Sequence, residues 1–155
     1  MNEYDDIRYQ AFANISQLSN RLQNVMDIGM KEITSKQWLP LILIGTFKTP
    51  PTLNELAKKC GITHQSAKQL IEKLDEKGYV TISRDEADKR YLLIELTDLG
   101  RQWSIDNEKR NRTFVYDLFA DIPKEEIEVF MNIQKKLIDF LDERKRQVKE
   151  GEYSV

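Results

Sequence analysis

The sequence predicts a mainly α-helical fold with one small β-hairpin. Across most of the 155 residues, apolar side chains recur at steps of three and four, which is the period of one helix face. After Gly78 the period changes to two, as in strands with one buried face, and after Leu96 it becomes helical again. With 40% apolar and 32% charged residues, we expect residues 1–155 to form a single globular chain with its own core.

Long helices are expected at both ends of the chain, in residues 5–29 and 98–148. The later segment starts at the Thr97-Asp98 cap and restarts near Pro123. The apolar stripes of these helices are wider than the rest of one subunit can cover. We therefore expect the stripes to form part of the core and the dimer interface rather than a ligand site. The stripe of the first helix comprises Ile7, Ala11, Phe12, Ile15, Leu18, Leu22, Val25 and Met26.

Residues 34–97 are expected to form a lobe of three shorter helices and the hairpin. Two of these helices start at capping boxes, in which a threonine caps the helix and a Gln or Glu three residues later reaches back. These boxes are Thr34 to Gln37 and Thr52 to Glu55. The first helix should run to about Phe47, with a kink rather than a break at Pro40.

The middle of the lobe has the spacing of a helix-turn-helix. Gly61 ends a short helix, because the residue after a helix often needs positive φ, and Thr63 caps the next helix. A hairpin with a charged tip, Arg84 to Arg90, follows directly and would make the lobe a winged helix-turn-helix. Helix pairs joined by a glycine turn also occur as plain packing units, so the spacing alone leaves both interpretations open.

The outer face of the helix after Gly61 has side chains suited to reading DNA. These residues are short or hydrogen-bonding and include no acid before Glu72. Glutamine can bond N6 and N7 of adenine, and lysine can contact phosphate or guanine. The predicted DNA contacts in this helix are Thr63, His64, Gln65, Ser66, Lys68, Gln69 and Lys73.

The hairpin tip supplies three more predicted DNA contacts, Arg84, Lys89 and Arg90. Asp88 is expected to orient the Arg90 guanidinium toward a minor groove. The alternative is a loop salt bridge worth under about 1 kcal/mol with no ligand. Residues 63–90 hold six basic and six acidic side chains, so attraction to phosphate is modest.

Four motifs in this order resemble the MarR (multiple-antibiotic-resistance regulator) family of winged-helix proteins. Ile33 to Trp38 resembles the family's second-helix opening, and Leu53 to Ala57 with Gly61 to Thr63 resembles its helix-turn-helix. Leu74 to Val80 resembles the exit of its recognition helix. Asp88 to Arg90, followed by Leu96 to Arg101, resembles its wing. The resemblance covers nearly the whole chain.

The resemblance implies a homodimer built from the first, fifth and sixth helices. It also implies a recognition helix from about Thr63 to Lys77, a wing arginine at Arg90, and an effector pocket near Trp38 and Met30. The implied function is a dimeric, sequence-specific transcriptional regulator, a repressor that binds an inverted repeat in double-stranded DNA and is released by a small aromatic or lipophilic effector. The alternative is a winged-helix dimer with little DNA affinity that acts as a protein-interaction module.

Composition and motifs exclude several other classes. No nucleophile–base pair or glycine-rich phosphate loop is visible, so we expect no enzyme and no cofactor. Cys60 is the one cysteine and His64 the one histidine, which is too few for a zinc site, and Cys60 is expected to pack in the core. The longest apolar run, Trp38 to Gly45, is too short to cross a bilayer, and no leader opens the chain, so we expect a cytoplasmic protein with no membrane partner.

Overall fold

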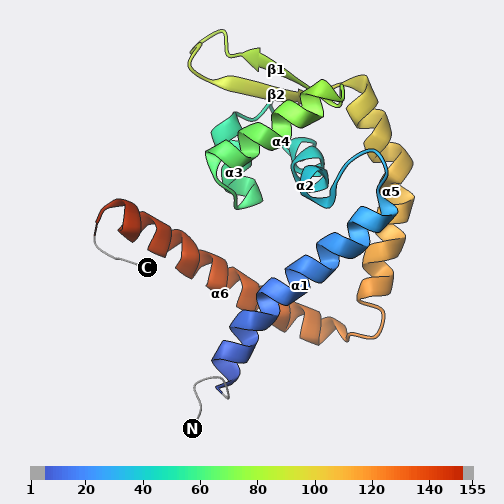
Figure 1. Ribbon diagram of the computed structural model, residues 1–155, viewed down its shortest axis with the longest axis vertical. Helices are drawn as coiled ribbons and strands as arrows, with labels where there is room; N and C mark the ends of the chain where they lie inside the picture. The colour runs from blue at the N-terminus through green and yellow to red at the C-terminus, as the bar shows by residue number, and fades with distance from the viewer. Residues whose placement is uncertain (1–5, 152–155) are drawn as a thin grey trace. The chain divides into compact units, whose positions relative to one another are not determined.

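The computed structural model describes residues 6–151 and confirms the predicted fold class: helices with one two-stranded antiparallel hairpin (Figure 1). Residue 5, assigned above to the first helix, lies outside the described residues. The chain divides into two compact units, and the boundary between them falls between residues 107 and 108, inside the segment 98–148. The elements are α1 (Ile7–Gly29), α2 (Ser35–Ile44), α3 (Leu53–Cys60), α4 (His64–Glu76), β1 (Val80–Arg84), β2 (Leu92–Leu96), α5 (Asp98–Leu118) and α6 (Lys124–Lys149).

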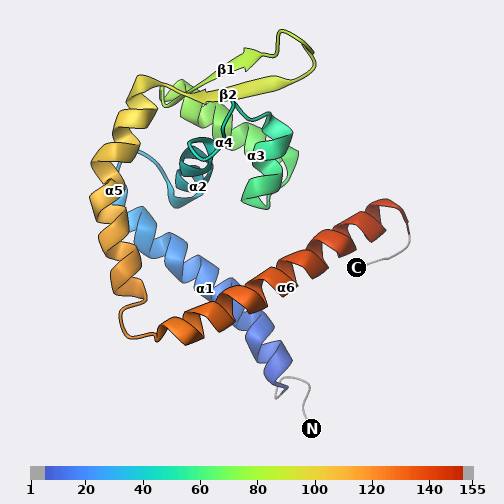
Figure 2. The ribbon, with the colours of Figure 1, turned by 180° about the vertical axis from the view of Figure 1, so that it is seen from behind.

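The core of the first unit lies where α2, α3 and α4 pack against one another and against the hairpin (Figures 1 and 2). Thirteen hydrophobic side chains are buried there, and all of them come from residues 33–103. The hairpin closes this core because Val80 and Ile94 face inward from its two strands. In the second unit, α6 has no buried residue.

The predicted helix starts are confirmed by the caps. The Thr34 side chain accepts from the backbone of Gln37 at 3.3 Å, and the Gln37 side chain accepts from the backbone of Thr34 at 3.1 Å. The Thr52 and Glu55 pair repeats this geometry at 3.2 and 2.8 Å. Each box satisfies two backbone donors that a helix start would leave unpaired, so these helices begin where the local sequence dictates.

The second helix is shorter than the sequence suggests. It passes unbroken through the buried Pro40 but ends at Ile44 instead of Phe47. Beyond it the backbone nitrogens of Thr46 and Phe47 donate to carbonyls three residues back, at 3.0 and 3.2 Å. The apolar residues after Ile44 therefore continue the hydrophobic pattern in a tight turn rather than in the helix.

Two glycines fix the geometry around α4. Gly61 has a φ of +69° at the end of α3, the left-handed conformation that sends the chain into the turn before α4. Gly100 packs so closely that a Cβ there would lie 2.1 Å from the Tyr79 carbonyl oxygen. The first turn of α5 is therefore held against the end of α4, and Thr97 adds a hydrogen bond of 2.6 Å to the Gly78 carbonyl oxygen.

Within residues 6–151, no helix has an apolar stretch long enough to span a bilayer.

Candidate nucleic-acid interface

The outer face of α4 is the centre of the candidate interface. All seven predicted contacts on this helix and its cap are exposed, whereas Ala67, Ile71 and Leu74 are buried on the opposite face. The hydroxyl groups of Thr63 and Ser66 serve the helix start: Thr63 accepts from the Ser66 backbone at 3.1 Å and donates to the Ser66 hydroxyl at 2.9 Å. The five longer predicted contacts on the same exposed face are His64, Gln65, Lys68, Gln69 and Lys73.

His64 is held by a residue that the sequence analysis did not identify. Its Nδ1 lies 2.6 Å from Oδ1 of Asn54, which sits in the first turn of α3. Both residues are exposed. Only the fold could show this contact, because the two residues are ten positions apart and meet only when Gly61 turns α4 back along α3.

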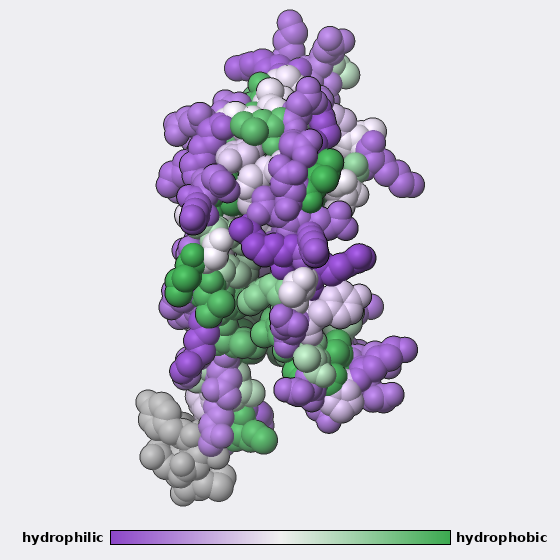
Figure 3. All heavy atoms as spheres, turned by 90° about the vertical axis from the view of Figure 1, so that its right-hand side faces the viewer, coloured by the Kyte–Doolittle hydropathy of each residue, from purple (hydrophilic) through white to green (hydrophobic). Residues whose placement is uncertain are grey.

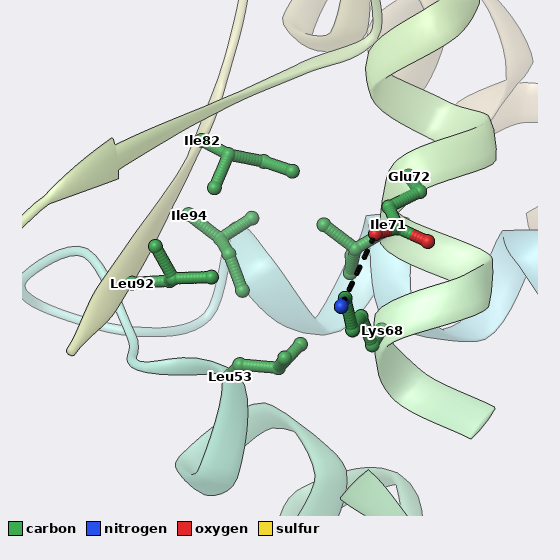
Figure 4. Close-up of a pocket in the computed structure, with 7 residues that line it drawn as sticks. All are labelled: Leu53, Lys68, Ile71, Glu72, Ile82, Leu92 and Ile94. Carbon is green, nitrogen blue, oxygen red and sulfur yellow. Dashed lines mark ion pairs between the residues drawn. The ribbon is translucent and has the colours of Figure 1, made fainter. Parts of the chain in front are cut away.

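Lys68 is partly occupied by a carboxylate of its own helix. Its ammonium lies 3.7 Å from Glu72, and both side chains are about half exposed. Figure 4 shows this ion pair beside a small cavity of about 30 Å³ between α4 and the hairpin, lined otherwise by apolar side chains. The apolar lining consists of Leu53, Ile71, Ile82, Leu92 and Ile94.

Replacing Glu72 by Gln is expected to release Lys68 and tighten binding to any duplex about threefold at low salt. An exposed pair of this kind is worth well under about 1 kcal/mol, so the helix should stay folded. A titration of a random duplex at two salt concentrations measures the effect, and the salt dependence should steepen if Lys68 gains a phosphate contact. Glu76→Gln removes the same charge one turn later; equal tightening by both variants would show that Lys68 is not involved.

Lys77 ends the predicted recognition helix, and its ammonium bonds to residues just before and within α2. Its ammonium donates to the Glu32 carbonyl oxygen at 2.7 Å and to the Gln37 side chain at 3.1 Å. The Glu32 carboxylate in turn accepts from the Trp103 indole at 3.2 Å. The loop between α1 and α2 is thereby attached to both α4 and α5.

The three predicted contacts of the wing differ in their surroundings. Arg84 belongs to β1, and its guanidinium donates to the Lys89 carbonyl oxygen at 3.1 Å across the loop. The Arg90 guanidinium donates to the Asp88 carboxylate from Nε at 2.9 Å and from Nη2 at 2.6 Å, and the Arg90 backbone donates to it at 3.1 Å. The guanidinium lowers the pKa of the Asp88 carboxyl and the carboxylate raises that of Arg90, although 84% of the Arg90 side chain is exposed.

Exchanging Arg90 for Lys is expected to weaken DNA binding about threefold or more although the positive charge is kept, because an ammonium cannot form the planar two-bond pair with Asp88. Asp88→Ala should also weaken binding, although it removes a charge that repels phosphate. Titrations at two salt concentrations, with circular dichroism to verify folding, test both variants. Tighter binding by Asp88→Ala would contradict an orienting role for that residue.

The residues named for an effector pocket are half-buried. Met30 and Trp38 both pack against the core. Within residues 6–151 the Trp38 indole nitrogen is buried with no hydrogen-bond partner. Two open cavities of about 310 and 260 Å³ lie elsewhere in the lobe and share Gly45, Leu96 and Arg101.

Cys60 is half-buried beside the core, and its burial raises the pKa of the thiol. A raised pKa disfavours the reactive thiolate. No cluster of three or more metal-ligating side chains occurs in the part of the chain that the structure describes.

Part of the chain is similar in sequence to known proteins. Residues 31–90 match the sequence profile of the MarR family. The uncharacterized HTH-type transcriptional regulator YcgE of Bacillus subtilis (strain 168) is 27% identical over 101 residues. These cover 65% of this chain and 66% of YcgE, just under two thirds of its length.

Solved structures with the same fold cover nearly the whole chain. A MarR protein from Peptoclostridium difficile has a TM-score of 0.81 at 22% identity, over 96% of this chain and 95% of its own. FabT of Streptococcus pneumoniae, solved in complex with DNA, has a TM-score of 0.66 at 22% identity, over 87% of this chain and 98% of its own. Residues 31–90 are thus similar to the MarR family, and the chain shares the winged helix-turn-helix fold of these solved structures.

Proposed function

We propose that this protein is a cytoplasmic homodimer that binds an inverted repeat in double-stranded DNA and represses transcription. The observation that carries the proposal is the exposed outer face of α4, which presents His64, two glutamines and two lysines while its other face is fixed in the core. Such a helix can enter a major groove and read base edges with its N-terminal residues. FabT, whose fold is similar, is described in complex with DNA.

The proposed dimer is supported by the long helices, each considered by itself. Neither α1 nor α6 has a buried residue in the isolated chain. Several apolar side chains on each helix are more than half exposed, among them Phe12 at 72% and Leu141 at 62%. Apolar side chains open to solvent are visible among hydrophilic ones in Figure 3. A patch of this kind marks an interaction surface, and a second copy of the chain would cover it symmetrically.

We propose that release from DNA involves a small aromatic or lipophilic effector near Trp38. The buried indole nitrogen of Trp38 is a donor without a partner among residues 6–151, and such a group is costly unless a ligand or solvent accepts from it. Met30 and the core surface beside it would supply apolar contact. The anchoring of the adjacent loop to α4 through Lys77 gives a route from this region to the recognition helix.

The second candidate is a dimeric protein-interaction module with little affinity for DNA. The internal bonds of Lys68, Arg84 and Arg90 favour it, because each cation already has a partner in the chain. A net charge of -2 adds no general attraction to DNA.

A binding titration separates the two candidates. The purified protein is titrated with duplexes selected from a randomised library and with random duplex, at about 50 and 200 mM salt. A regulator should select half-sites about 10 to 10.5 base pairs apart and prefer them over random sequence by at least about 10³-fold. Equal, weak and strongly salt-dependent binding to all duplexes would favour the interaction module.

A further inference from the structure

We propose that Asn54 is a positioning residue for sequence recognition, which fixes the single histidine so that it reads an amino group on a base edge. The amino group is N6 of adenine or N4 of cytosine. This inference rests on the proposed function, since it assigns one role within the DNA-binding face. It adds a residue of α3, outside the recognition helix, to the determinants of specificity.

The protonation of the His64 ring follows from the contact. Its Nδ1 lies 2.6 Å from the Asn54 side-chain oxygen, which can only accept a hydrogen bond. Nδ1 must therefore carry the proton. In the neutral ring the other nitrogen, Nε2, is then left without a proton and can only accept.

The position of His64 makes this acceptor relevant to DNA. It is the first residue of α4, and the N-terminal residues of a recognition helix are those that contact base edges. His64 is exposed, as is Asn54, and among residues 6–151 the hydrogen bond of its ring is made through Nδ1.

Among the other side chains of this face, Glu72 can only accept, but its carboxylate is paired with Lys68 at 3.7 Å and lies about two turns further along the helix. Lys68 and Lys73 can only donate, and an amide such as that of Gln65 or Gln69 can turn to donate or accept. The hydroxyl groups of Thr63 and Ser66 are engaged in the helix cap. At the N-terminal end of this face, His64 is thus a neutral side chain whose hydrogen-bonding direction is set by a neighbouring residue. In a major groove, an acceptor pairs with an amino group of adenine or cytosine.

The first arm of the experiment measures the tautomer without DNA. The chain has one histidine, so a tag-free, ¹⁵N-labelled sample gives a single imidazole in long-range ¹H–¹⁵N spectra. At about pH 8, where an ordinary imidazole is neutral, the wild type should carry its proton on Nδ1. Asn54→Ala should move the proton to Nε2, and Asn54→Asp, which keeps an accepting oxygen, should return it to Nδ1. A proton on Nε2 in the wild type would overturn the inference.

The second arm measures recognition on duplexes selected by the wild type. Adenine is replaced by purine, or cytosine by pyrimidin-2-one, at each half-site position in turn, which removes only the amino group. At one position the wild type should lose about three- to tenfold in affinity, whereas His64→Ala should lose nothing further there. Which analogue has this effect distinguishes adenine from cytosine.

A double-mutant cycle then tests whether Asn54 acts through His64. Asn54→Ala should lower the ratio of selected to random binding about three- to tenfold, and Asn54→Asp should restore it, since added charge affects both duplexes alike. The double variant should be no worse than His64→Ala. If the wild type is specific and Asn54→Ala keeps the same ratio of selected to random binding, the role proposed for Asn54 is wrong and the proposed function stands. A wild type without any sequence preference would contradict both.

Discussion

Placing an arginine at Leu18 is expected to convert the proposed dimer into monomers. Leu18 is 55% exposed on the apolar stripe of α1. If a second copy covers this stripe, the new charge is buried without a partner, which costs several kcal/mol and raises the dissociation constant of the dimer about 100-fold or more. Light scattering at micromolar concentration should give twice 18.3 kDa for the wild type and 18.3 kDa for the variant. Leu137→Arg, on α6, should have the same effect.

A matched control is available on the same helix. Asn20→Arg adds an identical charge on the opposite face of α1, where the neighbouring side chains are polar. It should leave both the mass and the melting temperature close to those of the wild type. Because dimer dissociation is linked to unfolding, the melting temperature of Leu18→Arg should also fall and depend on concentration. A wild-type chain that is monomeric at micromolar concentration with full helicity would contradict the proposed dimer and the two-fold operator.

Replacing Gln65 or Gln69 by alanine is expected to remove about 1 to 3 kcal/mol of binding to a selected duplex, with little loss on random DNA. Both residues are exposed on the outer face of α4. A glutamine that bonds two atoms of one adenine discriminates among bases, so its loss should also relax the sequence preference. Competition titrations with single-base variants of the selected duplex measure both effects.

Lys73→Ala provides the comparison for these variants. A lysine that contacts phosphate contributes alike to all sequences, so this change should weaken selected and random duplexes by a similar factor and reduce the salt slope by about one. If neither glutamine change alters the ratio of selected to random binding, the recognition face is assigned to the wrong side chains. The variants at Asn54 and His64 are independent of this result because they concern a different base position.

The sequence by itself determined the order of the elements and most of their boundaries. Thr34, Thr52 and Thr63 cap helices at the predicted places, and Gly61 has the predicted positive φ. These features depend on residues three or four positions apart, so they can be recognised in the sequence without knowledge of the fold. The exposure of the α4 face followed for the same reason, because the spacing of Ala67, Ile71 and Leu74 defines the opposite side.

Only the tertiary structure decided which of these side chains already have partners. Asn54 meets His64 across the turn, and Lys77 reaches a carbonyl 45 positions earlier. The end of α2 at Ile44 was likewise seen only in the structure, since the hydrophobic pattern continues to Phe47. Periodicity reports which face of a helix is buried, but the angle at which two helices pack determines which polar groups come within hydrogen-bonding distance, and that angle depends on the whole core.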